Sequence, residues 1–503
     1  MKFYKIVFSY IVFLFLLSNN TIAQSNSPIN LRCEYKVNPN GIATPHPRMS
    51  WQLSARENER AVLQVAYQIQ VAEKSNDLKT GKALLWDSGK QQSDQSIHIA
   101  YGGPKLKPKK EYHWRAKIWN NKKEESNWSE IAHWEMALLD TSEWIAQWIE
   151  PVLEERENAY NPSPLLRKEF QLNNSITKAR LYITAHGLYE AFLNGKQVGD
   201  ELFTPGWTSY NKRLQYQTYD VTRLLQKGEN AIAVRLGDGW FRGQFDSKDR
   251  WNKVYGTKTA LLFQLEITYK NGKTETIISD KNWKASTGAI VMSGIYDGGI
   301  YDARLEKTGW KEAGYNDRNW NPVRKVNHSK SRLVSTEGVP VRKMETITAK
   351  KIFRTPKGEL VADLGQNLVG WVELKIKGKR GDTITLHHAE VLDQEGNFYT
   401  ANLRTAGQKV QYIFKDNKEQ IFEPHFTFHG FRYVKIEGVE EPISPNQITG
   451  IAIYSKKEKT GSFECSNPLI NQLQQNIEWG QKGNFLDVPT DCPQRDERMG
   501  WTG

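Results

Sequence analysis

Short segments in which apolar and polar residues alternate run through most of this chain, and they limit the folds that it can adopt. They recur from about residue 27 to residue 456, separated by turn-forming glycine, proline, asparagine and aspartate. Successive side chains of a β-strand point to opposite faces, so a period of two buries one face of a sheet and leaves the other in water. The pattern predicts a multidomain, mostly β protein built from sandwiches.

The length of 503 residues implies several β-domains, because one hydrophobic core rarely organises so long a chain. Over residues 24–140, the segments AYQIQVA, EYHWRAKIW and AHWEM predict strands of a fibronectin-like or immunoglobulin-like sandwich. Residues 38–47 are rich in proline and glycine, and we expect them to form a loop.

Two further β-domains are expected after this sandwich. Residues 141–342 contain two alternating runs around Asn194-Gly195, the strongest short-range signal for a β-hairpin. This stretch resembles the jelly-roll sugar-binding domains of many glycoside hydrolases. Residues 343–457 contain TITLHHAEVL, QKVQYIFK and FRYVKIEGV, which alternate cleanly and predict a third sandwich.

The N-terminus has the anatomy of a secretory signal. Lys2 and Lys5 precede an apolar run over residues 6–17, and small residues follow at Thr21-Ile22-Ala23. The run is too short to cross a bilayer, and no other apolar run is long enough. Residues 1–23 are therefore predicted to be a signal peptide, and the protein is expected to be exported to the periplasm, the cell surface or the medium.

Charge and cysteine content narrow the expected partners. The net charge is +12, but lysine and arginine are spread along the chain among acids, which argues against nucleic acid. A polysaccharide that carries uronic acids remains an open alternative. Cys33, Cys465 and Cys492 are too few for a disulfide scaffold, and no Cys/His cluster has the spacing of a metal site. No cofactor is expected for catalysis.

The sequence pattern changes near residue 466. Ser466 or Asn467 is a candidate N-cap, Pro468 suits the first helical turn, and apolar residues follow at helical spacing. These apolar residues are Leu469, Ile470, Leu473 and Ile477. Residues 458–503 are expected to begin a helical domain whose remaining core lies outside this sequence.

Charged groups crowd the last stretch, DVPTDCPQRDERMGWTG. Pro489 and Pro493 predict a loop after the helix, and loops at element ends often carry catalytic groups. Arginines in a cleft can fix hydroxyls or depress the pKa of a neighbouring carboxylate, while a carboxylate with a raised pKa can donate a proton. A surface salt-bridge cluster is the alternative. The carboxylates, arginines and ring concerned are Asp491, Arg495, Asp496, Glu497, Arg498 and Trp501.

The stretch GNFLDVPTDCPQRDERMGWTG resembles the signature of the family 78 α-L-rhamnosidases. LRCEYKVNPNGIATPHPRMSWQL resembles their N-terminal module, and AHGLYEAFLNGKQVGDELFTPGWTSYNKRLQYQTYDVTRLL resembles their jelly roll. The resemblance covers residues 27–503. It implies several β-sandwiches, the third of them concanavalin-like, followed by the start of an (α/α)6 toroid.

The resemblance also implies roles for the charged residues. Glu497 would be the general acid, Asp491 and Arg495 would hold rhamnose hydroxyls, and Trp501 would contact the sugar. Asp496 would have a structural partner instead. An inverting enzyme needs a second carboxylate roughly 6.5–9.5 Å from the acid. In the family that base lies far downstream, so this chain alone is expected to lack it and to be inactive.

The predicted function is hydrolysis, with inversion, of terminal α-L-rhamnose from plant glycans or glycosides. The alternatives are a carbohydrate-binding fragment without catalysis, or a glycosidase of another sugar. Calcium on a sandwich module is a further alternative, because residues 238–253 and 296–304 offer oxygen ligands, although their spacing does not demand calcium. Tyr189, Glu190 and Trp207 are expected to serve packing or turns, with sugar binding as the alternative.

Overall fold

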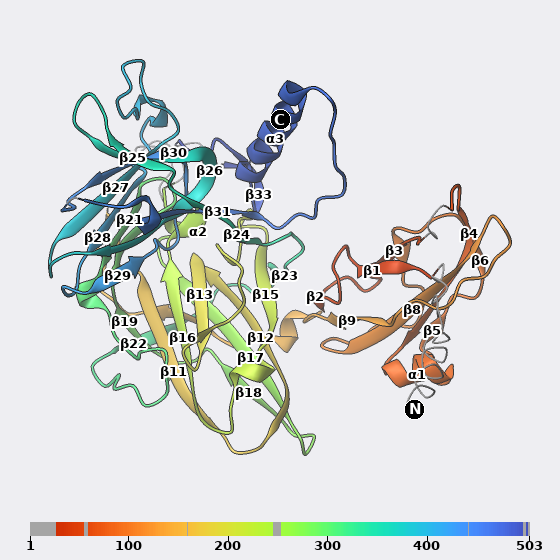
Figure 1. Cartoon of the computed structure of the whole chain (residues 1–503). Coiled ribbons are helices and arrows are strands. Elements are labelled where there is room, and N and C mark those ends of the chain that lie inside the picture. Colours follow the sequence, from red (N-terminus) through yellow and green to blue (C-terminus); the bar gives the residue numbers. More distant parts are fainter. Residues whose placement is uncertain are drawn as a thin grey trace, which may run out of the picture. The chain divides into compact units, whose positions relative to one another are not determined.

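The computed structural model describes residues 27–54, 59–157, 159–244, 253–440, 442–495 and 499–500. It divides into two compact units, Met1–Leu139 and Asp140–Gly503 (Figure 1). Both units consist mainly of β-strands, as the alternation predicts. The predicted signal peptide lies outside the described residues. None of the helices in the described ranges is long and apolar enough to cross a membrane.

The first unit is an immunoglobulin-like sandwich of a three-stranded and a six-stranded sheet. Trp51, Trp114 and Trp134 are buried between the sheets, so these three tryptophans serve the core of the unit. One prediction is wrong: the loop expected over residues 38–47 contains the short strand β2, which pairs with β9. The elements are β1 (Ile29–Cys33), β2 (Asn40–Ile42), β3 (Arg48–Gln52), β4 (Gln64–Ala72), α1 (Ser75–Thr80), β5 (Trp86–Asp87), β6 (Gln91–Gln92), β7 (Ile99–Ala100), β8 (Glu111–Asn120) and β9 (Ala132–Met136).

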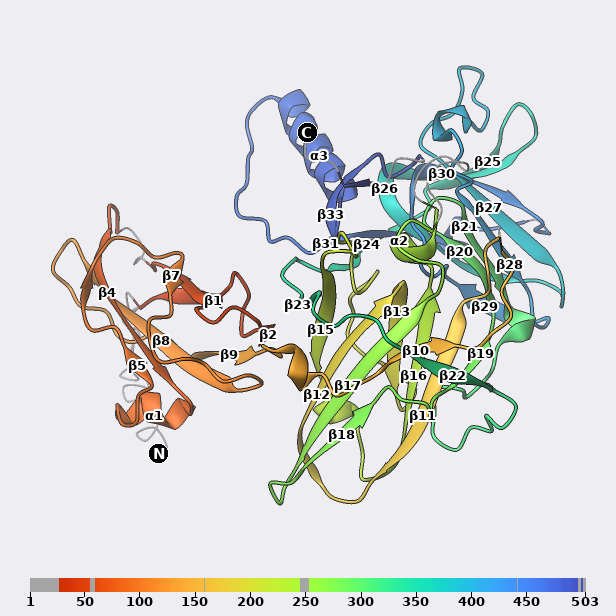
Figure 2. The ribbon, with the colours of Figure 1, turned by 180° about the vertical axis from the view of Figure 1, so that it is seen from behind.

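The second unit begins with a jelly roll whose strands form one continuous twelve-stranded sheet folded into two layers (Figures 1 and 2). Their inner faces bury a single apolar cluster that includes Leu181, Val234 and Phe263. The strands are β10 (Trp148–Pro151), β11 (Pro164–Leu172), β12 (Ile176–His186), β13 (Leu188–Leu193), β14 (Lys196–Gln197), β15 (Leu214–Asp220), β16 (Gly228–Gly237), β17 (Ala260–Tyr269), β18 (Thr274–Ile278), β19 (Lys284–Thr287), β22 (Asn321–Val326) and β23 (Leu333–Ser335). Short helices are η1 (Thr141–Glu143), η2 (Thr222–Leu224) and α2 (Gly239–Arg242).

The predicted hairpin at Asn194-Gly195 is confirmed, because β13 and β14 pair across it. Asn194 has a φ of 51° and Gly195 a φ of 79°. Both turn residues therefore have the positive φ that a two-residue turn between twisted strands requires. The Asn194 side chain also accepts a hydrogen bond from the Ala231 amide at 2.8 Å, which fixes the turn against β16.

The third β-domain is a ten-stranded sheet that wraps around its own core, which includes Leu364, Leu386 and Phe431. The hairpin β20–β21 precedes β22 in sequence, yet β21 pairs with β28 in this sheet, so strands of the two domains alternate along the chain. The elements are β20 (Ile290–Gly294), β21 (Gly298–Asp302), η3 (Ala303–Leu305), β24 (Val341–Thr348), β25 (Lys351–Arg354), β26 (Leu360–Lys377), β27 (Thr383–Ala389), η4 (Ala401–Leu403), β28 (Lys409–Ile413), β29 (Glu419–Phe422), β30 (His429–Glu437), η5 (Pro445–Gln447) and β31 (Ile448–Ser455).

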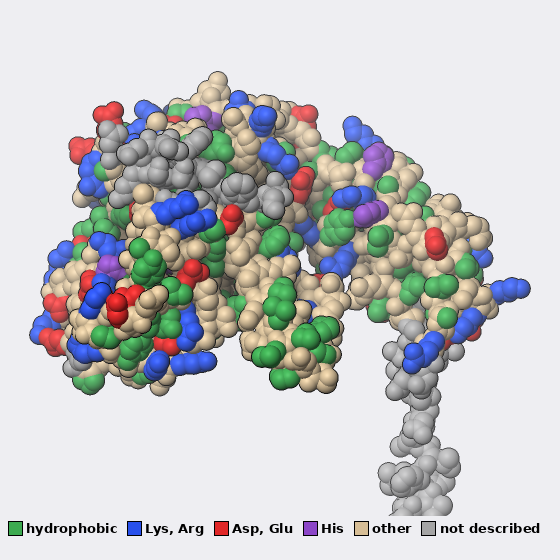
Figure 3. All heavy atoms as spheres, turned by 90° about the horizontal axis from the view of Figure 1, so that it is seen from above, with side chains coloured by type: hydrophobic (Ala, Val, Ile, Leu, Met, Phe, Trp, Pro, Cys, Tyr) green, Lys and Arg blue, Asp and Glu red, His purple; other side chains and the backbone are tan. Residues whose placement is uncertain are grey.

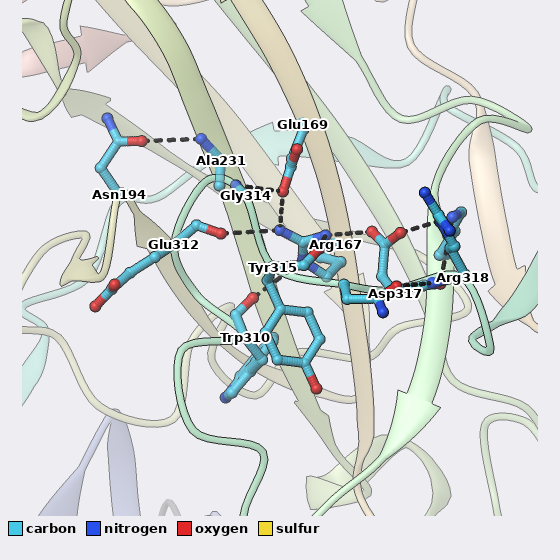
Figure 4. Close-up of polar contacts among 12 residues, drawn as sticks. Arg167, Glu169, Asn194, Ala231, Trp310, Glu312, Gly314, Tyr315, Asp317 and Arg318 are labelled. Atoms are coloured by element: carbon cyan, nitrogen blue, oxygen red, sulfur yellow. Dashed lines mark hydrogen bonds and ion pairs between the residues drawn. The ribbon is translucent and has the colours of Figure 1, made fainter.

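A buried arginine ties the loop after η3 to the jelly roll (Figure 4). Arg167, on β11, forms ion pairs with Glu169 and Asp317 and has a fully buried side chain. It also donates to the carbonyl oxygens of Trp310 at 3.1 Å and Glu312 at 2.9 Å. A guanidinium so placed satisfies several acceptors at once, which compensates for its removal from water.

The helix predicted near residue 466 is α3 (Pro468–Gly483), with Asn467 as its N-cap. The Asn467 side chain accepts from the Leu469 amide at 3.0 Å. The apolar stripe of α3 is not covered: Leu469 is 78% exposed and Leu473 56% exposed. Figure 3 shows apolar side chains on the projecting part of the surface that α3 forms. The helix is followed by β32 (Phe485–Leu486), β33 (Val488–Asp491) and β34 (Met499–Gly500).

Candidate active-site hairpin

Within the charged stretch at the end of the chain, residues 488–491 and 499–500 form the paired strands β33 and β34 of a β-hairpin. Asp491 pairs with Met499 and Thr490 pairs with Gly500, so residues 492–498 connect two antiparallel strands. The prediction from the prolines is therefore wrong for residues 488–491, which form β33. Pro489 pairs only with Phe485 of β32, because the pairing of β33 with β34 begins at Thr490, so one side of the strand is unpaired at the proline. A hairpin holds the polar residues of its turn more firmly than a free loop would.

Two predicted site residues fall within the described part of the hairpin. Asp491 is half-buried at the end of β33, and its Oδ1 accepts a hydrogen bond from the Cys492 thiol at 2.6 Å. Burial and this contact raise the pKa of the Cys492 thiol to about 11. Arg495 follows in the turn, where its amide donates to the Cys492 carbonyl at 3.2 Å. The structure thus places a carboxylate and a guanidinium on one short turn.

The remaining predicted residues lie outside the described residues. These are Asp496, Glu497, Arg498 and Trp501. The assignments of Asp496 as a structural acid, Glu497 as the general acid and Trp501 as a sugar contact therefore stay predictions.

The tip of the hairpin packs against the third β-domain. A Cβ placed on Gly430 of β30 would lie 2.9 Å from Cβ of Gln494, so the two backbones approach closely. The Gln408 side chain donates a hydrogen bond to the Gln494 carbonyl. Beneath this contact the rings of His388 and His429 stack with centroids 4.2 Å apart. The described part of the turn therefore rests on a buried aromatic layer.

The base of the hairpin is held by Asp487, a residue to which the sequence pattern assigns no role. Its Oδ2 accepts from the Trp207 amide of the jelly roll at 2.6 Å. Its own amide donates to Ser455 Oγ, at the end of β31, at 3.0 Å. Burial raises the pKa of the Asp487 carboxyl to about 6, although the hydrogen bond from Trp207 favours the ionised form. The importance of Asp487 becomes evident only from its hydrogen bond to Trp207, which is 280 residues away in the sequence.

A second polar site lies in a cavity of about 380 Å³ between the jelly roll and the third β-domain. Glu190 from β13 forms an ion pair with Arg235 at 2.9 Å and contacts His425 at 2.8 Å. Burial opposes ionisation of Glu190, but the charges of His425 and Arg235 outweigh it and lower its pKa to about 2. This cluster joins the two domains and leaves polar groups at the cavity wall that can accept a small polar ligand.

Tyr189 and Trp207 have packing contacts in this region, as expected. Tyr189 is buried, and its hydroxyl donates to Gln217 at 2.7 Å. The ring of Trp207 stacks on Trp240 with centroids 5.9 Å apart. Together with the ion pairs of Glu190, these contacts give each of the three residues a structural role.

The described carboxylates of the segments considered for calcium contact other side chains, and residues 245–252 lie outside the described residues. Asp238 contacts the Arg242 guanidinium at 2.6 Å, and Asp302 contacts Arg304 at 2.8 Å. Tyr160 donates to Asp297 at 2.7 Å. Within the described residues there is no group of three or more His, Cys, Asp or Glu side chains that could hold a metal ion. These carboxylates therefore do not converge on a shared point.

Four family models match successive parts of the chain. Residues 28–140 match the Rha78A-like N-terminal immunoglobulin domain, and residues 174–345 match the α-L-rhamnosidase N-terminal domain. Residues 353–454 match the bacterial α-L-rhamnosidase concanavalin-like domain. Residues 458–503, which include the hairpin, match the bacterial α-L-rhamnosidase 6 hairpin glycosidase domain.

Individual relatives agree with these models. An α-L-rhamnosidase of Formosa agariphila is 40% identical over 100% of this chain and 55% of its own length. One from Alteromonas sp. strain LOR is 36% identical over 98% of this chain and 54% of its own length. The chain thus spans about half the length of the curated relatives it matches.

Solved structures show the same similarity. The structure of the Streptomyces avermitilis α-L-rhamnosidase complexed with L-rhamnose has a TM-score of 0.89 and 31% identity, over 95% of this chain and 62% of that one. The Aspergillus terreus α-L-rhamnosidase has a TM-score of 0.88 and 38% identity, over 95% of this chain and 54% of that one.

Proposed function

The chain belongs to the family 78 α-L-rhamnosidases, and on this premise we propose that the whole protein hydrolyses terminal α-linked L-rhamnose from plant glycans or glycosides. The observation that carries the proposal is the match of four rhamnosidase domain models, in order, along residues 28–503. The last of them contains the hairpin with Asp491 and Arg495. The proposed substrate class follows the relative that was solved with L-rhamnose.

In the proposed mechanism each residue of the hairpin has one task. Glu497 protonates the glycosidic oxygen as the bond to the anomeric carbon breaks. Asp491 and Arg495 hold rhamnose hydroxyls, with the carboxylate accepting hydrogen bonds and the guanidinium donating them. Trp501 covers the apolar face of the sugar.

Inversion requires a second carboxylate on the opposite face of the sugar, roughly 6.5–9.5 Å from the acid, to activate water. We propose that this base lies outside these 503 residues, further along the protein. Under the same proposal, additional helices of a toroid cover the exposed stripe of α3, since the segment that contains α3 matches a six-hairpin glycosidase domain. The signal-like N-terminus favours export, which remains part of the proposal.

A second candidate function is carbohydrate binding without catalysis by these 503 residues. The cavity of about 380 Å³ beside Glu190 and Arg235 favours it, because it offers a concave site with several polar groups on its wall. The two candidates differ in what a bound sugar undergoes, so a turnover assay separates them.

The test is an assay with an aryl α-L-rhamnoside on three proteins: the full reading frame, its Glu497→Gln variant and the 503-residue chain. Glu464→Gln is the matched control, because Glu464 is an exposed glutamate before α3. We expect the full protein and the control to be active, and the Glu497→Gln variant to lose about 10²–10⁴-fold. Substantial activity in Glu497→Gln would refute its role as acid. Activity in the 503-residue chain would place the base within it.

A further inference from the structure

Asp487 lies where the C-terminal hairpin, the jelly roll and the end of β31 contact one another. Leu486 pairs with Val488, so the chain reverses at Asp487 between β32 and β33. Asp487 has a φ of 69°, in the left-handed region that residues other than glycine rarely adopt. Its side chain accepts from the jelly-roll amide of Trp207, and its amide donates to Ser455 at the end of β31. An unfavourable conformation is thus maintained by contacts from two other domains.

The jelly-roll loop that contains Gly206 and Trp207 leaves room for the Asp487 carboxylate. Gly206, with a φ of 94°, precedes Trp207, and a Cβ on it would lie 2.7 Å from Asp487 Oδ2 and 3.0 Å from Gln215 Nε2. Only glycine combines this backbone with the absence of a side chain. The Tyr210 hydroxyl donates to the Gly206 carbonyl at 2.7 Å and fixes the other side of the loop. The loop therefore presents the Trp207 amide to a carboxylate at close range.

Asp487 supplies the hydrogen bond that connects the base of the hairpin to the jelly roll. Three residues lie between Asp487 and Asp491, and all three belong to β33. The Thr490 amide donates to the Asn484 carbonyl at 2.9 Å, which fixes β33 to the end of α3 but not to the jelly roll. A shift of Asp487 would therefore pass along β33 to Asp491 and Arg495.

We propose that Asp487 is a positioning residue: by binding the Trp207 amide, it fixes the base of the hairpin and so places Asp491 and Arg495 for the sugar. The inference rests on the proposed rhamnosidase function. Asp487 acts through the hairpin, without touching the substrate. Misplacement of binding groups by about 1 Å can cost about 100-fold in rate.

The experiment measures kcat and KM for an aryl α-L-rhamnoside with the full reading frame that contains this chain. Asp487→Ala removes the acceptor, and we expect kcat/KM to fall about 100-fold. Asp487→Asn keeps an acceptor oxygen for the Trp207 amide, and we expect it to stay within about tenfold of the wild type. Thermal midpoints of each variant show whether it is folded at the assay temperature. A merely structural aspartate would lower the midpoint without this loss in the folded enzyme.

A second pair of variants reports on the same contact from the jelly-roll side. Gly206→Ala pushes against Asp487 Oδ2, whereas Gly228→Ala meets nothing within 4 Å although its φ is 99°. Both substitutions impose a similar backbone strain, so only Gly206→Ala is expected to lower kcat/KM. If Asp487→Ala does not fold, this pair decides: equal activities overturn the proposal, and a selective loss in Gly206→Ala supports it.

The outcomes separate the inference from the function on which it rests. An inactive wild-type full-length protein refutes the proposed function. An active wild type with a folded and fully active Asp487→Ala overturns the positioning role alone. A folded Asp487→Asn that is as impaired as Asp487→Ala also overturns it, because the acceptor oxygen would then not be what matters.

Discussion

Glu190, Arg235 and His425 form an ion cluster between the jelly roll and the third β-domain. The structure allows an estimate of how much this cluster contributes to the free energy of unfolding. In Glu190→Gln, Arg235 and His425 lose the negative charge that they face at 2.9 Å and 2.8 Å. The pKa of Glu190 is lowered from its usual 4.5 to about 2. Because a tenfold change in an acid constant is worth about 1.4 kcal/mol, this corresponds to about 3 kcal/mol. Removal of one partner from a buried pair costs about 3–5 kcal/mol, in agreement.

The dependence on pH has a definite sign. A carboxyl whose pKa is lowered in the folded state contributes its full stabilisation above about pH 4.5, and this contribution is lost as pH falls towards about 2. The difference between the wild type and Glu190→Gln should therefore be present at about pH 5 and shrink in more acid solution.

The assay is urea unfolding of the 503-residue chain, followed by tryptophan fluorescence at several pH values. The two compact units unfold separately in principle, so the transition of the second unit is the one to compare. Glu229→Gln, on β16, is the control because Glu229 is exposed. A loss below about 1 kcal/mol at about pH 5, or a difference that does not change with pH, would refute the reasoning.

Three further predictions use other parts of the structure. Arg167→Met should destabilise the second unit by about 3 kcal/mol in urea unfolding, at the low end because Asp317 keeps Lys284 as a partner at 2.6 Å; a loss below about 1 kcal/mol would contradict this. Leu473→Ala should change the stability of the 503-residue chain by less than about 0.5 kcal/mol, since Leu473 is 56% exposed, but should cost about 2–5 kcal/mol in the full protein if a toroid covers it. Alkylation of Cys492 by iodoacetamide, followed by mass spectrometry, should be slow at pH 8 and accelerate up to about pH 11; labelling at pH 8 as fast as that of an unstructured cysteine peptide would show that its thiol is not perturbed.

The sequence predicts the elements whose determinants are local. The segments over β4, β8 and β9 alternate with a period of two, and all three are strands. Asn194-Gly195 forms its turn because both residues tolerate a positive φ. Asn467 and Pro468 begin α3 because one caps free amides and the other lacks an amide to satisfy. In each case the residues that decide the structure are neighbours in sequence.

Other features depend on contacts that local patterns do not contain. Pro489 predicts a loop, yet the pairing of β33 with β32 and β34 makes a strand of residues 488–491. The pairing of β21 with β28 cannot be read from either segment alone. The motif identifies Asp491 and Arg495 by their chemistry, but not the glycines and amides on which the hairpin rests.

The structure connects the ion cluster to the hairpin through a short series of contacts. Tyr189, beside Glu190 on β13, donates its amide to the Thr204 carbonyl at 2.9 Å. Thr204 begins the loop that contains Gly206 and presents the Trp207 amide to Asp487. The loop that contacts the hairpin is therefore hydrogen-bonded to the strand that carries Glu190 of the ion cluster. Asp487 and Trp207 are 280 residues apart in sequence, so under the positioning proposal the placement of Asp491 and Arg495 depends on a contact with the jelly roll.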